Sequence, residues 1–438
     1  MLNVADKAGL QAAKTANVRK AVAAATVGTV IEWYDYALYG AASGLIINKL
    51  FFPTLSPLSG VLAAFATFAV GYFIRPLGGI VISHIGDKIG RKPALILTIA
   101  LMGLATVGMG LLPTYAQVGA LAPILLVLMR LLQGFGAGAE LAGAIVLVAE
   151  YAPPGRRAFY TSLPNAATLV GIMLATAAFL GISYLPEETL LGWAWRIPFL
   201  VSGVLFIVAL YIRKHLDETP EYVAAMSRAQ ETKHEQKVPL KELMRESPKE
   251  VLFGFLSVTG HNANAYILSA FSISYMTNTV GMTRPDSLIA VTFASLCGII
   301  GVPLMGLLAD RIGSAKVYIG GAAFVFLLSY PLFMMLDTGS IYWAAFGMSL
   351  GYGIGFGAMA GAQGAFLSNL FPTRYRFSGL AMSRELNGVL VAGPTPLIAS
   401  ALVAAADGKP TLVAAYLMVC CALTVIAVLI IQNRSVHE

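Results

Sequence analysis

Long apolar runs separated by short polar segments set the pattern of this chain. Windows of about 20 mainly apolar residues, the length that a helix needs to cross a bilayer, recur about twelve times. We expect helices because lipid requires backbone hydrogen bonds to close within the protein, and because the runs are far longer than barrel strands. The predicted spans are 21–48, 58–84, 93–112, 119–150, 158–183, 195–213, 250–278, 287–309, 315–336, 340–368, 376–404 and 411–432.

One charged segment divides the predicted spans six and six. It runs from about His215 to Lys249 and is the expected linker between the halves of a membrane protein built from repeats. The sequence therefore predicts an all-α integral membrane protein with two pseudo-symmetric six-helix bundles. The predicted parts are a cytoplasmic tail (1–20), a first bundle (21–214), the cytoplasmic linker (215–249), a second bundle (250–432) and a second cytoplasmic tail (433–438).

The basic residues indicate the orientation. The two tails, the linker and the loops after even-numbered spans hold most of the 29 lysines and arginines. We find only Lys49, Arg284 and Lys409 in the opposite loops. Because lysine and arginine collect on the cytoplasmic side, both termini are predicted to be cytoplasmic, in a bacterial-type inner membrane. The net charge of +7 then reflects topology, and no nucleic-acid partner is expected.

The composition agrees with a membrane protein. Only 12% of the residues are charged, whereas a soluble domain averages about 25%. The three cysteines have no metal-ligand or disulfide spacing, so they are interpreted as small apolar side chains. The histidines are scattered and no phosphate-binding loop appears. We therefore predict neither an enzyme nor a cofactor.

Two polar turns repeat at matching positions of the two halves. The segment ISHIGDKIGRKPAL (82–95) follows the second span, and MGLLADRIGSAKVY (305–318) follows the eighth. The repeat indicates a duplicated bundle in which an aspartate meets the N-terminus of a neighbouring helix and basic residues meet the membrane surface. We predict a charged gate on the cytoplasmic side. Its predicted members are Asp87, Arg91, Lys92, Glu150, Arg157, Asp310 and Arg311.

These turns resemble the cytoplasmic signature of the major facilitator superfamily. Two departures are that Ser83 replaces the usual leading glycine and that the second copy ends in GSAK instead of GRK. The segment RLLQGFGAGAE (130–140) looks like the Arg-x-x-Gln-Gly motif of that superfamily. The segments EWYDYALYG, FFP, FIRPLGG, GWAWRIPF and LDETPEY together are similar to its metabolite:proton symporter family.

The resemblance implies a function as well as a fold. Members of that family carry shikimate, 2-oxoglutarate, citrate and related acids, or proline and betaine. The chain is thus expected to be a secondary active transporter that takes up a small organic acid, such as shikimate or a di- or tricarboxylate, by proton-coupled symport and alternating access. Spans 1, 4, 7 and 10 are expected around a central cavity. The expected partners are the substrate, protons and the lipid bilayer. The protein is expected to be a monomer.

Two other transport functions are alternatives to organic-acid symport. Symport of a zwitterionic osmolyte such as proline or betaine is the main alternative. Drug/proton antiport is less favoured because the fifth span, SLPNAATLVGIMLATAAFLG, lacks the G-x-x-x-G-P-x-x-G-G pattern of superfamily antiporters.

The first predicted span contains two carboxylates, Glu32 and Asp35. An ionised group in the bilayer interior costs at least about 2.5–3.5 kcal/mol, so such acids are functional candidates by default. The i, i+3 spacing puts both on one helix face, and two close carboxylates in a low dielectric favour protonation of one. We predict that at least one of them carries the coupling proton. The alternative is a structural pair that Arg130 or backbone groups satisfy.

Arg130, in the fourth span, presents a planar cationic fork that fits a carboxylate. It is expected to bind an anionic substrate, to pair with Asp35, or to alternate between the two. Arg75 and Glu140 are predicted to form a structural ion pair, and Arg384 is a second candidate for the substrate anion. The predicted substrate-binding residues are Tyr36, Tyr39, Arg130, Gln133, His261, Asn262, Asn264, Tyr266, Gln363, Arg384 and Asn387.

Overall fold

The computed structural model describes residues 22–23, 26–89, 91–137, 145, 148–149, 152–153, 155–215, 240–371 and 376–434. All regular secondary structure in these ranges is helical. Each window that the apolar pattern marks as a span overlaps a helix in the described residues, which confirms the all-α prediction.

The first half of the chain contains six helical spans, several of them interrupted. Residues 26–42 are helical and continue into a π-helical turn. The elements that follow are η1 (Ser43–Ile47), α2 (Asn48–Phe51), α3 (Pro57–Phe73), α4 (Arg75–Ile89), α5 (Arg91–Leu111), α6 (Tyr115–Val118), α7 (Leu121–Gly136), α9 (Arg157–Ser183), α10 (Glu187–Thr189), η2 (Leu190–Ala194) and α11 (Arg196–His215).

The second half also contains six spans, and a short helix of the predicted linker precedes them. Its elements are α13 (Leu240–Glu246), α14 (Pro248–Tyr266), η3 (Ile267–Phe271), α15 (Ser272–Ser274), η4 (Tyr275–Thr279), α16 (Arg284–Ile312), α17 (Ser314–Asp337), α18 (Ile341–Leu350), η5 (Gly351–Phe356), α19 (Gly357–Leu370), α20 (Arg376–Asn387), η6 (Gly388–Ala392), α21 (Thr395–Ala405) and α22 (Thr411–Arg434).

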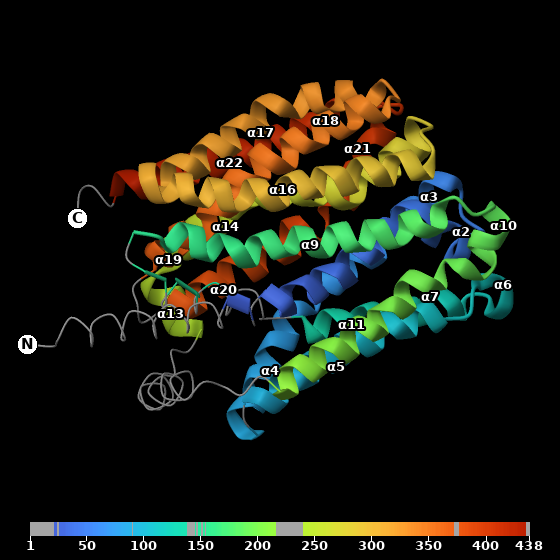
Figure 1. The fold of residues 1–438 in the computed structure, drawn as a ribbon, viewed down its shortest axis with the longest axis horizontal. Helices are drawn as coiled ribbons and strands as arrows, with labels where there is room; N and C mark the ends of the chain where they lie inside the picture. Colours follow the sequence, from blue (N-terminus) through green and yellow to red (C-terminus); the bar gives the residue numbers. More distant parts are fainter. Residues whose placement is uncertain are drawn as a thin grey trace, which may run out of the picture.

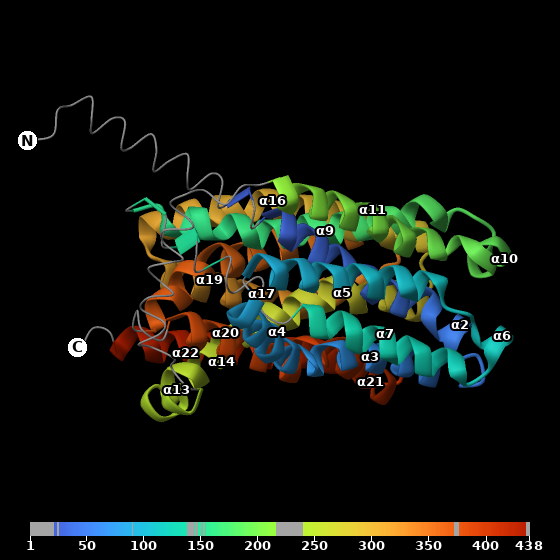
Figure 2. The ribbon, with the colours of Figure 1, turned by 90° about the horizontal axis from the view of Figure 1, so that it is seen from below.

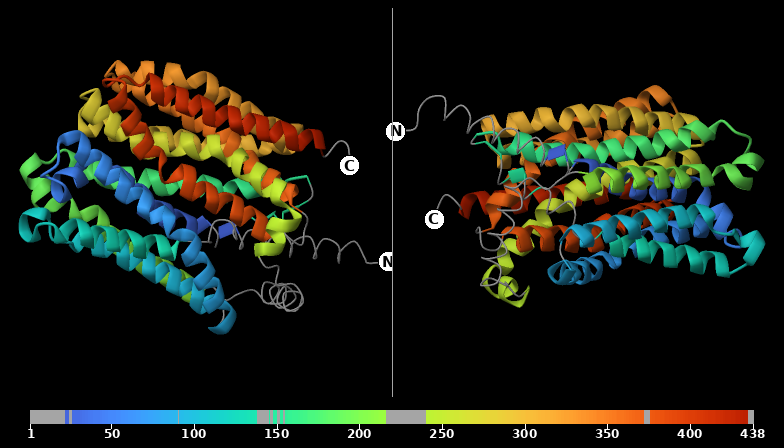
Figure 3. Two further views of the ribbon diagram at one scale, coloured as in Figure 1. Left: turned by 180° about the vertical axis from the view of Figure 1, so that it is seen from behind. Right: turned by 60° about the horizontal axis from the view of Figure 1, so that its bottom comes forward.

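The two halves lie side by side with their helices roughly aligned. Helices α5, α7 and α11 lie on one side of the molecule and α17, α18 and α22 on the other (Figures 1 and 3). Helix α9 of the first half packs against α16 of the second half at the border between them. One end of the molecule carries α13 and the end of α22, and the other carries α6 and α10 (Figure 2). We call these the linker end and the distal end.

Length and apolarity alone identify only part of this bundle. Six described helices are long and apolar enough to cross a membrane, and a bent pair, Glu187–Ala194 with Arg196–Tyr211, makes a seventh. Two further spans are shorter apolar helices, Ile96–Leu111 and Leu121–Gly136. Breaks or π-helical turns interrupt several spans, as at Ile74 in the second span and at η3 in the seventh. Such breaks are frequent where helices line a functional site.

Glycines bring the second and fourth spans into backbone contact. A Cβ atom on Gly134 would lie 2.0 Å from the carbonyl oxygen of Gly71, and one on Gly78 would lie 2.0 Å from that of Phe135. Small residues allow this approach, which is a common way for membrane helices to associate. The close contact fixes the position of Arg75, which lies between Gly71 and Gly78, relative to Arg130 on α7.

Candidate functional site

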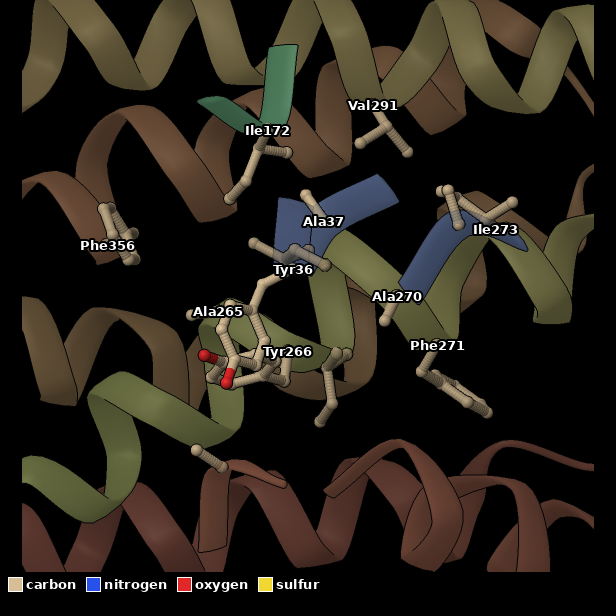
Figure 4. Packing of buried hydrophobic residues seen from close by; sticks show 14 of the residues in the cluster. Tyr36, Ala37, Ile172, Ala265, Tyr266, Ala270, Phe271, Ile273, Val291 and Phe356 are labelled. Carbon is tan, nitrogen blue, oxygen red and sulfur yellow. The ribbon is translucent and has the colours of Figure 1, made fainter. Parts of the chain in front are cut away.

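A small closed cavity lies between the two halves. The first half contributes residues from the first, second and fifth spans, and the second half contributes residues from α14 and η3. Figure 4 shows Tyr36, Ala37, Ile172, Tyr266 and Ala270 around this point. The lining is aromatic and aliphatic apart from hydroxyl groups and the indole N–H of Trp33. The full set is Trp33, Tyr36, Ala37, Gly40, Phe68, Ile172, Tyr266, Ser269 and Ala270.

Contacts between the halves close the cavity on both sides. On the distal side, Asn278 Nδ2 donates to the carbonyl oxygen of Gly44 at 3.0 Å. On the linker side of the lining, the hydroxyl groups of Tyr72 and Tyr266 form a hydrogen bond between α3 and α14. Among the described residues, contacts therefore join the two halves on both sides of the cavity.

Arg130 lies fully buried behind the cavity wall. Its guanidinium donates to the backbone oxygens of Thr67 at 3.3 Å and Phe68 at 2.7 Å, and to the side-chain oxygen of Gln133. Its charge centre lies 4.2 Å from the ring centre of Tyr39 and 5.3 Å from that of Tyr36. Among the described residues, no carboxylate lies within ion-pair distance of Arg130. A buried cation with neutral partners only is a suitable site for an anion.

Asp35 is also fully buried, on the other side of the first span. Ser202 Oγ in α11 donates to its Oδ1 at 2.6 Å, and Thr106 in α5 is the second hydroxyl that faces this carboxyl group. Gln133 Nε2 donates to Thr106 Oγ1 at 2.9 Å. Thr106 Oγ1 itself donates to the carbonyl oxygen of Met102 at 3.0 Å. Hydrogen bonds thus join Thr106, Gln133 and Arg130, and Asp35 lies beside Thr106 at the end of this series. The direct Asp35–Arg130 ion pair considered from the sequence is not formed in this structure.

Glu32 has different surroundings from Asp35 although only three residues separate them. Its Oε1 accepts from Arg75 Nη2 at 3.2 Å, and Arg75 Nε also donates to Glu385 Oε2 at 3.3 Å. The two acids therefore bind different groups, and the shared environment that we expected from their spacing is not seen. The predicted partner of Arg75, Glu140, lies outside the described residues, and Arg75 has two other carboxylate partners.

The predicted polar residues of the second half are mostly bonded to one another. His261 stacks on Phe356 with ring centres 4.6 Å apart. Asn262 Nδ2 donates to Asn387 Oδ1 at 2.7 Å, and Arg384 donates to the side-chain oxygen of Gln363. The remaining contacts are Asn264 Nδ2 to Gly351 O at 3.3 Å, Gln363 Nε2 to Tyr318 Oη at 3.1 Å, and Asn387 Nδ2 to Phe255 O and Thr259 Oγ1, both at 2.9 Å.

Of the predicted substrate-binding residues, Tyr36 and Tyr266 line the cavity. Tyr39 does not line the cavity but packs behind the lining residue Phe68, on whose ring it stacks. Its hydroxyl group forms a hydrogen bond of 2.6 Å with Thr67 Oγ1. Arg130, Gln133 and the polar group of the second half surround the cavity without forming its wall in this closed state. Their contact with a substrate stays a prediction.

The gate residues are described in part. Asp310, at the end of α16, accepts the backbone N–H groups of Ala158 at 2.8 Å and Phe159 at 2.9 Å in the first turn of α9. This carboxylate thus binds a helix N-terminus of the other half, as the repeat predicts. Arg157 donates to Asn369 Oδ1 at 3.0 Å, also across the two halves. Arg311 is exposed.

The other predicted gate residues cannot be placed in the same way. Helices α4 and α5 include Asp87, Arg91 and Lys92, but the side chains of these three residues lie outside the described part of the structure. Glu150 lies outside the described residues altogether.

Replacing Asp310 by Ala is expected to loosen the linker end. Loss of an N-terminal helix cap costs about 0.5–2 kcal/mol, and this cap joins the two halves. Hydrogen exchange in the first turn of α9, measured by mass spectrometry, should be about two- to thirtyfold faster. The matched control is Asp286→Ala, because Asp286 bonds Thr283 Oγ1 at 2.7 Å within its own half. Equal exchange of α9 in both variants would show that Asp310 does not hold the halves together.

Sequence reasoning missed several residues of the site. Phe68 and Ser269 line the cavity, Ser202 bonds Asp35, and Glu385 bonds Arg75. The apolar and hydroxyl residues carry no signal in a single sequence because membrane helices contain many of them. Glu385 does have a sequence signal, since it is an acid within a predicted span. The prediction names its neighbour Arg384 instead, as a candidate for the substrate anion. Among the described residues, no group of three metal-binding side chains is found.

Comparison with known proteins adds a family. Residues 25–384 match the family model described as Major Facilitator Superfamily. The chain is 35% identical over 418 residues to the shikimate transporter of Escherichia coli K12, covering 95% of each protein. It is 35% identical over 393 residues to the proline/betaine transporter of Salmonella typhimurium, covering 88% of this chain and 78% of that one. A solved structure of the proton:xylose symporter XylE superposes with a TM-score of 0.74 at 17% identity, covering 96% of each chain.

Proposed function

Since the chain belongs to the major facilitator superfamily, we propose that it is a proton-coupled symporter that imports a small organic acid. It is a multi-pass membrane protein of a family of transporters, not of enzymes. We place it in a bacterial inner membrane with the linker end facing the cytoplasm. The bacterial relatives and the basic residues of the tails and linker support this placement.

The buried guanidinium of Arg130, which has no carboxylate partner among the described residues, is the observation that carries the proposal. A buried cation beside a cavity attracts a carboxylate, and its planar fork fits one. The cavity wall is aromatic and aliphatic, and its polar side-chain groups are hydroxyl groups and the indole N–H of Trp33. Such a wall suits the ring and hydroxyl groups of a monocarboxylate better than it suits the several charges of citrate. We therefore propose a ring-bearing or hydroxylated monocarboxylate, of which shikimate is the example among the relatives' substrates.

We assign the coupling proton to Asp35. Its described partners are hydroxyl groups, so an ionised Asp35 would be a buried charge without an ion-pair partner among the described residues. The Thr106–Gln133 link gives this carboxyl group a route to affect Arg130. Substrate at Arg130 and a proton at Asp35 would then favour the same closed state. The coupling ion is the proton, and no cofactor enters the proposal.

Alternating access follows from contacts that must break in turn. Asp310 and Arg157 hold the halves together at the linker end, and Asn278 holds them at the distal end. Opening to one side breaks one set and keeps the other. The two six-helix halves, predicted as 21–214 and 250–432, are the bodies that move, and we propose that one chain suffices.

A zwitterionic osmolyte is the second candidate, and the cavity wall supports it. Trp33, Tyr36, Phe68 and Tyr266 surround the cavity, and aromatic rings of this kind bind quaternary ammonium groups. Betaine also has one carboxylate for Arg130. The neighbouring guanidiniums of Arg75 and Arg130, 5.2 and 5.3 Å from the Tyr36 ring, oppose a second cation and favour the acid.

The test is proton movement in liposomes that contain the purified protein and a pH-sensitive dye. Shikimate, 2-oxoglutarate, citrate, proline and betaine are added outside, one at a time. We expect internal acidification with shikimate and none with citrate. Acidification with betaine or proline alone would replace the first candidate by the second. Uptake of a labelled solute without acidification would contradict proton coupling.

A further inference from the structure

Arg75 in α4 binds one carboxylate from each half of the protein. Its Nη2 donates at 3.2 Å to Glu32, which belongs to the first half, and its Nε donates at 3.3 Å to Glu385 in α20 of the second half. Nη2 also donates to the carbonyl oxygen of Ala137 at 3.2 Å, again in the first half. Arg75 is therefore anchored in the first half, and Glu385 is the group that reaches across to it.

This cluster lies on the linker side of the cavity. The first span runs away from the linker end, and Glu32 precedes the cavity residue Tyr36. The second span runs toward the linker end, and Arg75 follows the cavity residue Phe68. Opening the linker end moves the halves apart on this side. The Arg75–Glu385 contact must then break, whereas Arg75 and Glu32 stay together.

The two acids differ in their access to water. The side chain of Glu385 is 18% exposed and that of Glu32 is 3% exposed, so a proton reaches Glu385 more easily. The charged and titratable groups that face Glu385 are Arg75 of α4, Arg384 of its own helix and Tyr36 of the first span.

We propose that Glu385 is a proton-sensitive gating residue, which holds the halves closed through Arg75 and releases them when it takes up a proton. The proposal rests on the proposed symport. Breaking the contact while Glu385 is ionised would leave a largely buried carboxylate without this partner, which is costly. Neutral Glu385 leaves no such charge, and Arg75 keeps Glu32. The proton comes from the water that reaches Glu385, and no bond other than this O–H bond forms.

The same cluster gives a reason for pairing one proton with one carboxylate. It contains two cations, Arg75 and Arg384, and two acids, Glu32 and Glu385. Protonation of Glu385 leaves one net positive charge in the cluster. Arg75 and Arg130 both lie over the Tyr36 ring, at 5.2 and 5.3 Å, so this extra charge favours an acid anion at the neighbouring Arg130. A proton at Glu385 and an anion at Arg130 thus favour each other.

The experiment compares two matched variants, Glu385→Gln and Glu32→Gln, by hydrogen exchange in the first turn of α9. Each removes one acid of Arg75, but only Glu385 lies across the interface. Loss of a charged hydrogen bond predicts about tenfold or faster exchange in Glu385→Gln. Glu32→Gln should show unchanged or slower exchange, because Arg75 then keeps Glu385 alone. Equal acceleration in both variants would overturn the proposal, as would no acceleration in Glu385→Gln.

A pH series tests the proton itself and needs no substrate. After correction for the intrinsic rate, exchange in α9 of the unaltered protein should be faster at pH 5.5 than at pH 7.5. Glu385→Gln should be fast at both values, and Glu32→Gln should keep the pH dependence. Persistence of the pH dependence in Glu385→Gln would assign it to another group and overturn the proposal.

If Glu385→Gln does not fold, Glu385→Asp should show a smaller acceleration. If the exchange rates differ between the variants as expected but no solute causes acidification in the liposomes, the proposed function is contradicted and the role of Glu385 in closure is not.

Discussion

In Asp35→Asn, exchange of substrate across the membrane is expected to survive, while accumulation driven by a pH gradient is lost. Asparagine has the shape of a protonated aspartic acid and still accepts a hydrogen bond from Ser202, so the fold should be kept. It has no proton to release. Each pH unit can drive about tenfold accumulation per coupled proton, so a gradient of about two units predicts up to 100-fold accumulation by the unaltered protein. The variant should reach a ratio of about one.

The measurement is labelled uptake into liposomes, in two modes. One mode imposes the pH gradient, and the other loads the liposomes with unlabelled acid and follows exchange at equal pH. The control is Asp286→Asn, which makes the same change at an exposed helix start away from the cavity. Accumulation by Asp35→Asn equal to that of the control would show that Asp35 does not carry the proton. Loss of both modes would show a structural role instead.

The fold follows from the sequence because its signals are long and redundant. Twelve apolar runs, one charged linker and two repeated turns each predict the same architecture, so an error in one boundary changes little. Asp310 shows that a residue-level prediction is also feasible when a repeat supports it. Its expected contact with a neighbouring helix N-terminus is formed with α9.

The site was predicted less well. The spacing of residues shows which of them share a helix face, but it does not show which other helix packs against that face. Glu32 and Asp35 are three residues apart, yet Glu32 reaches α4 and Asp35 reaches α11. The side-chain direction at each position and the packing of three other spans decide this. The partner of Arg75 shows the same limit, since Glu385 is 310 residues away in sequence and no local pattern connects the two.

The second large effect is expected at Arg130, and it depends on the shape of the cation more than on its charge. The guanidinium uses three of its donors on Thr67, Phe68 and Gln133, and it faces the Tyr39 ring. Lysine keeps the charge but cannot make this set of contacts or offer a planar fork to a carboxylate. Removing one member of a buried charge pair costs about 3–5 kcal/mol, which corresponds to roughly 150- to 5000-fold, and lysine should lose less because it keeps the charge. We therefore expect Arg130→Lys to lower the apparent affinity for the acid by about 100-fold.

A matched substitution separates binding from stability. Arg196 also donates to two backbone oxygens, those of Gly110 at 2.8 Å and Leu112 at 2.6 Å, and it lies 4.4 Å from the Trp195 ring centre. None of these partners lines the cavity, whereas Arg130 contacts the lining residues Tyr36 and Phe68. Arg196→Lys should therefore cost stability without changing affinity. Concentration-dependent exchange by both variants, with their melting temperatures, decides the matter. If Arg130→Lys loses no more affinity than Arg196→Lys at equal stability, Arg130 is a structural residue. The anion site would then have to be sought at Arg384.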